Sequence, residues 1–594
     1  MSDAILIFTF SPIQPFITEA RRAADLYVGS HILVDLAEAA ADAISSSGGD
    51  LIYPTTPDQL EADALNKPVA RREDAPNKLV ARVPFLSART IAENAQTALL
   101  ERWNQIAKTA REELAGKETW PDDIWRKIWE RQTAHLWEIY WAAARVPESG
   151  QEAYKHAYNE ASRALDASKR SRAFAASDEP GRKDTLSGRR EALHTAGQDA
   201  ASYWKAVSAQ PHVTAAKLRP GGVERLDAIG AVKRFCSLAQ RPFPSTSTVA
   251  SWDFLQQARP HLKLYGLAVQ VLVGSKLFRV REDADWPYDG DLLYLEGLTP
   301  ARLKDSYGLE VAESDPDLKA AQRLLRETYD QAGCRPALYY GIIMLDGDNM
   351  GQHVSHCLDR PDPAEAHRAL SRTLADFAAQ VRPLVKASTD GLDALVYNGG
   401  DDVLALAPLV SALTTGQKLA GTFQSIVADG TASAGIAIVH HTYPLGAALR
   451  AAREAEKQAK LVPGKAAVCV RVLKRSGDTA EMRSSWAALD EIGAKLVRYF
   501  IGDEQGEFLS SKFAYDVAQA AYALPEADDK WEAEVKRLIL RHRNPKRLAR
   551  QEAEKWAREL AGELCTWAMA LPEGPADLGR WLIFARFLAQ RGGE

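Results

Sequence analysis

Two stretches carry the most structural information in this sequence: LYYGIIMLDGD at residues 338–348 and ALVYNGGDDVLALA at residues 394–407. The first is an apolar run that ends in acidic residues, which predicts a buried strand with a polar exit. The second has two short apolar runs around Asn398-Gly399-Gly400. Asn-Gly and Gly-Gly are strong signals for a tight hairpin, because its central residues need positive φ. We therefore expect three strands, two of them joined as a hairpin.

Helices and further strands are predicted around these stretches. Apolar periodicity predicts helices near residues 363–388, 411–428 and 445–460, and strands at Ala432–Val439 and Ala466–Val472. The order strand, helix, hairpin, helix, strand is that of a ferredoxin-like domain. Beyond about residue 480 the pattern is helical, which predicts a C-terminal helical bundle.

The N-terminal half of the sequence is less regular. Residues 4–10 read as a buried strand, and apolar residues then recur every three or four positions from Ile13 to Ile44, as in one long helix. A helical region rich in tryptophan follows, in which Trp137 and Trp141 are four positions apart, the spacing of one helical face. The apolar run Gly266–Val273 is interpreted as strand.

Two acidic clusters are expected to meet in this topology. Asp346-Gly347-Asp348 follows the first strand, and Asp401-Asp402 leaves the hairpin before the third. Those strands are neighbours in a ferredoxin-like sheet, so their carboxylates converge, and their repulsion is costly unless a cation neutralises it. Magnesium takes one or two carboxylates and leaves positions for phosphates, which suits a two-ion site for nucleotidyl transfer. Either motif alone is more often a polar turn.

Composition sets the remaining limits. A chain of 594 residues predicts several domains. Its 74 Lys and Arg against 79 Asp and Glu argue against nucleic-acid binding over the whole surface, although a local basic face stays possible. The five cysteines form no CxxC pair, and no apolar run is long enough to span a membrane. We expect a reducing, cytoplasmic location and no membrane partner.

One basic segment has two interpretations. Residues 169–190 contain seven basic and three acidic residues among Ser, Gly and Pro, which predicts a loop. Such a loop either contacts an RNA phosphate backbone or is a solvated linker. The sequence leaves both interpretations open.

The sequence resembles the large, polymerase-like subunit of type III CRISPR effector complexes, in particular the Cmr (III-B) branch. The resemblance rests on FSPIQPFI, LDGDNMG, NGGDD and SAGIAI at residues 10–17, 345–351, 398–402 and 433–438, and on FPST at 243–246. It implies an α+β multidomain fold with two ferredoxin-like, nucleotidyl-cyclase-like palm domains, a helical insert and a C-terminal helical bundle. The implied domains are an N-terminal palm with the Trp-rich insert, an inter-palm α/β region, a catalytic palm with the GGDD hairpin and a C-terminal helical domain, at residues 1–210, 211–334, 335–475 and 476–594.

The resemblance also implies a function. In the family, target RNA paired with guide RNA switches on synthesis of a cyclic oligoadenylate messenger from ATP, inside a complex with other Cmr-type subunits. Carried over by position, Asp346, Asp401 and Asp402 would be catalytic and hold two Mg²⁺ or Mn²⁺ ions, with Asp348 a weaker candidate ligand. The implied nucleotide-binding residues are Gly347, Gly399, Gly400, Lys460, Ser11 and Gln14, the last two holding the acceptor nucleotide from the other palm. The alternatives are a solvated helix lysine at Lys460 and a helix cap at Ser11.

The sequence departs from the family at two places, and two other functions are compatible with it. Related subunits often start with a His-Asp nuclease domain, yet no His-Asp dipeptide occurs here, so we expect no DNA cleavage. Asp227 and Gly230 stand where the family has zinc-binding cysteines, and the lone Cys236 cannot replace four ligands, so we expect no zinc. The rivals are a non-catalytic, nucleotide-binding scaffold and a stand-alone cyclic-dinucleotide cyclase.

Overall fold

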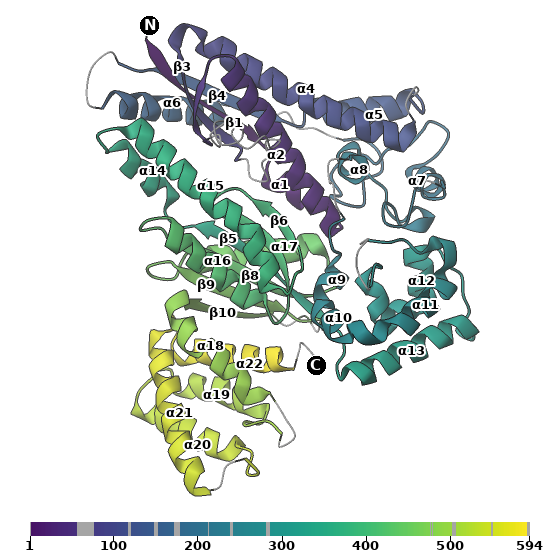
Figure 1. The fold of residues 1–594 in the computed structure, drawn as a ribbon, viewed down its shortest axis with the longest axis vertical. Coiled ribbons are helices and arrows are strands. Elements are labelled where there is room, and N and C mark those ends of the chain that lie inside the picture. Colours follow the sequence, from purple (N-terminus) through teal and green to yellow (C-terminus); the bar gives the residue numbers. More distant parts are fainter. Residues whose placement is uncertain are drawn as a thin grey trace.

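The computed structural model describes residues 2–55, 76–116, 120–147, 152–171, 179–211, 213–237, 242–280, 286–475, 477, 479–501, 506–547 and 550–590. The sheet that contains β1 lies at one end of the molecule, the sheet that contains β5 lies in the middle, and a helical bundle lies at the other end (Figure 1). No helix in the described ranges is long and apolar enough to cross a membrane.

The strands are β1 (Asp3–Ser11), β2 (Asp50–Tyr53), β3 (Lys78–Pro84), β4 (Glu138–Arg145), β5 (Tyr339–Gly347), β6 (Leu395–Asn398), β7 (Asp402–Pro408), β8 (Ala432–His440), β9 (Ala467–Leu473) and β10 (Thr479–Ser485). The helices are α1 (Gln14–Thr18), α2 (Ala23–Ser46), α4 (Ala88–Ala115), α5 (Asp123–Ala134), α6 (Ala153–Arg170), α7 (Ala200–Ser208), α8 (Ala228–Phe235), α9 (Thr246–Ala250), α10 (Trp252–Ala258), α11 (Leu262–Val273), α12 (Pro300–Tyr307), α13 (Pro316–Ala332), α14 (Met350–Leu358), α15 (Pro363–Ser388), α16 (Ala412–Ile426), α17 (Leu445–Ala459), α18 (Trp486–Phe500), α19 (Lys512–Ala523), α20 (Asp529–His542), α21 (Arg550–Ala570) and α22 (Pro575–Ala589).

The N-terminal sheet has the strand order β2-β3-β1-β4, and its strands are antiparallel. Strand β1 is buried on both faces because alternate residues point to opposite sides. Leu6 and Phe8 belong to the core that contains α2 and α4, whereas Ile5 and Ile7 pack with residues of α6. The sheet is therefore a layer between two sets of helices.

The second sheet has the order β10-β9-β8-β5-β7-β6, with β5 in its interior. Helices α15 and α16 contribute to the core on one face, and α17 packs on the other. The expected strand, helix, hairpin, helix, strand order is confirmed for β5 to β8. Strand β9 adds to β8 in parallel and β10 adds to β9 antiparallel.

The two sheets repeat one topology. The order β2-β3-β1-β4 in the first corresponds to β6-β7-β5-β8 in the second. The helices repeat as well. Helix α2 follows the first strand of its sheet as α15 does, α4 precedes the fourth strand as α16 does, and α6 follows the fourth strand as α17 does. The expectation of two palm domains with a helical insert and a C-terminal bundle is confirmed, and the bundle comprises α18 to α22 (Figure 1).

Several local predictions were wrong. Gly266–Val273 lies in helix α11, where Tyr265, Val269 and Leu272 are buried at helical spacing. A short apolar run does not distinguish a strand from a helix, and here tertiary contacts on one side of the segment favour the helix. The long helix expected from Ile13 is interrupted, because α1 ends at Thr18 and α2 begins at Ala23.

The tryptophan-rich region is helical in α4, α5 and α6, as predicted, but not around Trp137 and Trp141. Trp141 lies in strand β4 and Trp137 just before it, so they do not share a helical face. The segment pairs along the whole of β1, which outweighs its helix-like spacing. Strand β10 also differs from its prediction, because it lies in the region expected to be helical. Pairing with the edge strand β9 favours the extended conformation there.

A buried cluster of charges ties the inter-palm region to the N-terminal palm. Arg234 of α8 donates to both oxygens of Asp25 of α2, at 2.7 and 2.8 Å. Its Nη1 lies 3.3 Å from Glu224, which also binds Arg22 at 2.6 Å. Asp227, at the position expected for a family cysteine, caps α8 by accepting from Gly230 N at 2.6 Å. Two acids and two arginines thus balance one another in the interior.

His367 of α15 lies at the contact between the palms. Its Nδ1 is 3.1 Å from Tyr154 Oη of α6, and its ring stacks against Tyr53. Burial lowers the pKa of His367 to about 4, and the charge of Lys78 acts in the same direction. The neutral imidazole is therefore the form that suits this contact.

We expect stability to fall with acidification through His367. The unfolded chain takes up the proton near pH 6.5 and the folded chain only near pH 4, so up to about 3 kcal/mol is lost between those values. Thermal melts from pH 7.5 to 4.5 should show a shallower decline for His367→Gln than for wild type. The exposed His356 of α14 gives the control His356→Gln, and an equal decline in all three proteins would contradict the prediction.

Candidate active site

Three carboxylates meet where β5, the β6–β7 hairpin and α17 come together. Asp346 at the end of β5 is paired in register with Asp402 at the start of β7. Gly347 N donates to Asp401 O at 3.0 Å, which joins the strand exit to the hairpin turn. The structure thus brings Asp346, Asp401 and Asp402 together, as the strand order requires.

The hairpin that holds Asp401 and Asp402 depends on its two glycines. Gly400 has φ +97°, a conformation that residues with a side chain rarely adopt. A Cβ on Gly399 would collide with the hydroxyl of Tyr397. Asn398 ties the turn to helix α15 by donating its Nδ2 hydrogen to Ala378 O at 2.8 Å. The conformation of the turn therefore requires glycine at both positions, whether or not a nucleotide binds there.

Burial and mutual repulsion disfavour the charged carboxylates. The pKa of Asp402 is raised to about 8 by burial first and then by Asp346, Asp401 and Glu456. Burial and Asp346 raise the pKa of Asp401 to about 6, against the opposing effect of Lys460. A bound cation would favour the charged carboxylates and lower these pKa values.

Helix α17 supplies the charged side chains nearest to the carboxylates. Lys460, directly after the helix, contacts Asp346 Oδ2 and lies 3.3 Å from Glu456. Arg453 acts electrostatically on Asp402. Lys460 was predicted from the sequence, and it is not a solvated surface lysine. Arg453 and Glu456 were missed, although their spacing from Lys460 of seven and four residues places them on the same helical face.

Asp348 has a different environment from the other three carboxylates. It is buried, and its oxygens accept from Ser433 Oγ at 2.9 and 3.0 Å, from Thr431 Oγ1 at 2.9 Å and from Ala466 N at 3.0 Å. These bonds join the exit of β5 to β8 and to the start of β9. Asp348 is therefore engaged by protein donors.

The donor set of the site suits a hard divalent cation. Asp346, Asp401 and Asp402 offer carboxylate oxygens, which Mg²⁺ and Mn²⁺ prefer. Burial and the neighbouring carboxylates raise the pKa of Asp401 and of Asp402. In the described part of the chain, no three His, Cys, Asp or Glu side chains are already grouped closely enough to hold a metal ion.

A cavity of about 1150 Å³ extends from the N-terminal part of α17 to the inter-palm region. Arg450 and Arg453 line it, as do Arg22 of the N-terminal palm and Arg302 of α12. Arg453 also acts electrostatically on Asp402, but none of the three carboxylates lines this cavity. Its size and its arginines suit an anionic ligand with several phosphate groups.

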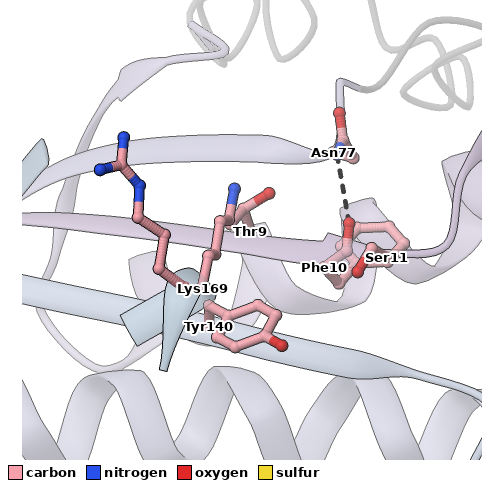
Figure 2. Close-up of a pocket in the computed structure, with 7 residues that line it drawn as sticks. Thr9, Phe10, Ser11, Asn77, Tyr140 and Lys169 are labelled. Atoms are coloured by element: carbon pink, nitrogen blue, oxygen red, sulfur yellow. Dashed lines mark hydrogen bonds between the residues drawn. The ribbon is translucent and has the colours of Figure 1, made fainter. Parts of the chain in front are cut away.

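The two residues predicted to bind nucleotide from the N-terminal palm, Ser11 and Gln14, do not line the same cavity. Ser11 lines a cavity of about 480 Å³ (Figure 2) and donates to Glu138 Oε2 at 3.3 Å, and it does not cap a helix. Gln14 begins α1, is exposed and is not among the residues that line this cavity.

The basic segment at 169–190 is partly engaged within the protein. Arg189 and Arg190 pair with Glu19, at 3.2 and 2.8 Å, and Arg190 also binds Asp227 at 3.0 Å. These contacts favour the interpretation as a linker for this part of the segment. Arg172 and Asp178 lie outside the described residues.

Comparison with known proteins identifies related sequences for two parts of the chain. Residues 339–469 match the family model described as Cas10/Cmr2, second palm domain, and residues 5–108 match the model of the CRISPR-associated protein Cmr2, N-terminal. The CRISPR system Cmr subunit Cmr2 of Pyrococcus furiosus is 30% identical over 310 residues, which cover 46% of this chain and 34% of that protein. This chain thus aligns with about a third of the curated relative's length.

Two solved structures share the fold. A chain in the cryo-EM structure of the apo state of a type III-B Cmr-beta has a TM-score of 0.63 at 12% identity, covering 100% of this chain and 82% of that one. A chain of the Cmr-beta structure bound to cognate target RNA has a TM-score of 0.60 at 11% identity, covering 92% and 79%. At such identities the likeness shows the fold alone.

Proposed function

Since residues 339–469 and 5–108 match the models of the Cas10/Cmr2 second palm domain and of the Cmr2 N-terminal region, we propose that the chain is a large subunit that converts ATP to a cyclic oligoadenylate-type messenger when target RNA binds. We infer that it works with other Cmr-type subunits, a guide RNA and a complementary target RNA. The reaction joins a ribose 3′-hydroxyl of one ATP to the α-phosphate of another and releases pyrophosphate.

One observation carries the proposal. Asp346, Asp401 and Asp402 converge at one site, where burial and repulsion raise the pKa of Asp402 to about 8. A fold has no physical need to gather like charges at such a cost, but a cation-dependent phosphoryl-transfer site does.

The residues around the carboxylates have separate tasks in this proposal. Asp346, Asp401 and Asp402 would hold Mg²⁺ or Mn²⁺, and such ions, when bound, activate the attacking hydroxyl and stabilise charge on the leaving pyrophosphate. Arg453, which acts electrostatically on Asp402, orients the triphosphate beside the carboxylates. Gly399 and Gly400 keep the hairpin backbone free of side chains, and Asp348 fixes the position of the β5 exit.

The scaffold alternative is favoured by one contact. Lys460 already neutralises Asp346, so the site has an internal counter-charge without any ligand. A scaffold that only binds nucleotide would keep Lys460 and Asp346 together, whereas a catalytic site would release Lys460 to the triphosphate.

The test of the function uses the chain purified with its guide RNA and partner subunits. We expect pyrophosphate release and a new adenylate, identified by mass spectrometry, only when Mg²⁺, ATP and complementary target RNA are all present. Non-complementary RNA of equal length is the control. Absence of turnover with intact target binding would favour the scaffold.

Lys460→Ala is expected to lower kcat/KM for ATP about 10-fold, because a charge-assisted contact is worth about 1.5–3 kcal/mol. Initial rates of pyrophosphate release at low and saturating ATP measure the effect. Lys457, exposed on the same helix, gives the matched control Lys457→Ala. A higher rate in Lys460→Ala would mean that Lys460 blocks Asp346 rather than assisting at the site.

A further inference from the structure

The hairpin that carries Asp401 and Asp402 contacts the N-terminal palm as well as its own domain. Its first strand, β6, is an edge strand of the second sheet, and helix α2 of the N-terminal palm packs against it (Figure 1). An edge strand has backbone groups that no neighbouring strand pairs, so a helix or loop commonly covers it. Here the covering helix belongs to the other palm.

A β-bulge in β6 lies at this contact. Leu395 and Tyr397 of β6 pair with two consecutive residues of β7, so the register gives β6 one extra residue, Val396. The extra residue of a bulge lies outside the ladder, and the bulge bends the strand and redirects the residues that follow it. Because this bulge comes directly before the hairpin turn, it sets the direction in which the chain enters that turn.

Ser30 of α2 bonds to the bulge. Its Oγ donates to Val396 O, and both residues are buried. The same Oγ lies 2.8 Å from Tyr27 O, one turn earlier in α2, so the hydroxyl is held between the helix and the strand. A buried carbonyl without a donor is costly. The Ser30 hydroxyl therefore stabilises the bulged form of β6.

Helix α2 is itself fixed close to the start of its chain segment. Asp25, in its first turn, accepts two hydrogen bonds from Arg234 of α8, at 2.7 and 2.8 Å. Lys233 of the same helix donates to Glu19 O, just before α2, at 2.9 Å. These buried contacts fix α2 on the inter-palm region. Ser30 is thus presented to β6 from a supported position, as a residue that orients another group requires.

The reverse contact between the palms offers a comparison. Ser371 lies on α15, the helix that corresponds to α2, and its Oγ accepts from Thr55 N at 2.8 Å. Thr55 follows β2, whose register with β3 also gives one extra residue, Ile52. Each palm therefore bonds to the other through a buried serine of a long helix. The Ser371 bond acts on the N-terminal palm, whereas the Ser30 bond acts on the strand that enters the carboxylate hairpin.

We propose that Ser30 is a positioning residue for this hairpin, which by bonding to Val396 O holds the bulge in β6 and so sets where Asp401 and Asp402 lie relative to Asp346. Its role in turnover rests on the proposed function, but its effect on the hairpin does not. The N-terminal palm thereby completes the geometry of the carboxylate site through an uncharged residue.

The first test measures hydrogen exchange of the full chain by mass spectrometry, without ATP or RNA. The amides of Gly399 and Gly347 bond to Asp402 O at 2.8 Å and to Asp401 O at 3.0 Å, so they report on the hairpin. We expect Ser30→Ala to speed exchange in the peptides that contain them by about 10-fold, because the variant leaves a buried carbonyl without its donor.

The matched control is Ser371→Ala. It also removes one buried serine hydroxyl at the contact between the palms, but the bond that it breaks belongs to Thr55. We expect it to leave exchange in the hairpin unchanged.

The second test measures turnover by the assembled complex with target RNA. We expect Ser30→Ala to lower kcat for ATP about 10-fold and to change KM less than about 2-fold, because displaced carboxylates act on the transition state while the contacts that bind the substrate are kept. Ser30→Cys keeps a similar shape with a weaker donor, so its kcat should lie between those of Ser30→Ala and the wild type.

Each outcome decides the proposal. Equal exchange in the hairpin of Ser30→Ala and wild type would overturn it, as would an equal increase in Ser371→Ala. Slower turnover in Ser30→Cys than in Ser30→Ala would assign the effect to packing and would also overturn it. Faster hairpin exchange in Ser30→Ala, together with a wild-type complex that forms no adenylate with Mg²⁺ and target RNA, would support the positioning role and contradict the proposed function.

Discussion

Turnover of ATP is expected to fall about 1,000-fold or more when Asp401 and Asp402 are both replaced by asparagine. The change removes two of the three carboxylates that would hold the ions, and ion-based stabilisation of the transition state is worth several kcal/mol, at about 1.4 kcal/mol per factor of ten. The measurement is pyrophosphate release by the assembled complex with target RNA.

The same variant is expected to keep its fold. Asparagine has nearly the shape of aspartate and is always neutral, so the variant avoids both the burial of charge and the mutual repulsion that together raise the pKa of Asp402 to about 8. The melting temperature should therefore be unchanged or higher. Asp376→Asn, at an exposed position of α15 in the same palm, is the control and should leave turnover unchanged. Loss of complex assembly in the double variant, with normal assembly of the control, would mean that the pair is structural.

Arg234→Ala is expected to destabilise the N-terminal part of the chain by about 3–5 kcal/mol. Arg234 neutralises Asp25 through two hydrogen bonds and also contacts Glu224, and all three side chains are buried. Removing it leaves an uncompensated negative charge in the interior, which costs far more than an exposed ion pair contributes. Because a chain with several domains does not unfold in one step, hydrogen exchange of the α8 amides is the direct measurement.

A matched control separates this effect from the loss of any arginine. Arg89 pairs with Glu93 on the exposed side of α4, so Arg89→Ala should leave exchange in α8 unchanged. Equal protection of α8 in wild type and Arg234→Ala would contradict the prediction. It would mean that the charge cluster does not hold the inter-palm region against the N-terminal palm.

Local sequence signals were sufficient for the second palm, which contains β5 to β9. The apolar run of β5, the Asn398-Gly399 turn and the periodicity of α15 to α17 are each dictated by neighbouring residues, and the elements were confirmed nearly at their expected bounds. The same signals were ambiguous at α11 and β4, where an apolar segment can adopt either structure and packing or strand pairing made the choice.

The candidate site also combines features that the sequence predicts with features that only the tertiary structure shows. The sequence by itself determined the adjacent strands, the tight turn and hence the convergence of Asp346 with Asp402, because strand order and turn type follow from local patterns. Only the tertiary structure decided which charges surround them. Asp348 is engaged by Ser433, and Arg453 and Glu456 reach the site from α17, contacts between segments far apart in the chain. The tertiary structure likewise placed Ser30 of α2 against Val396 of β6, since long-range packing has no local signal.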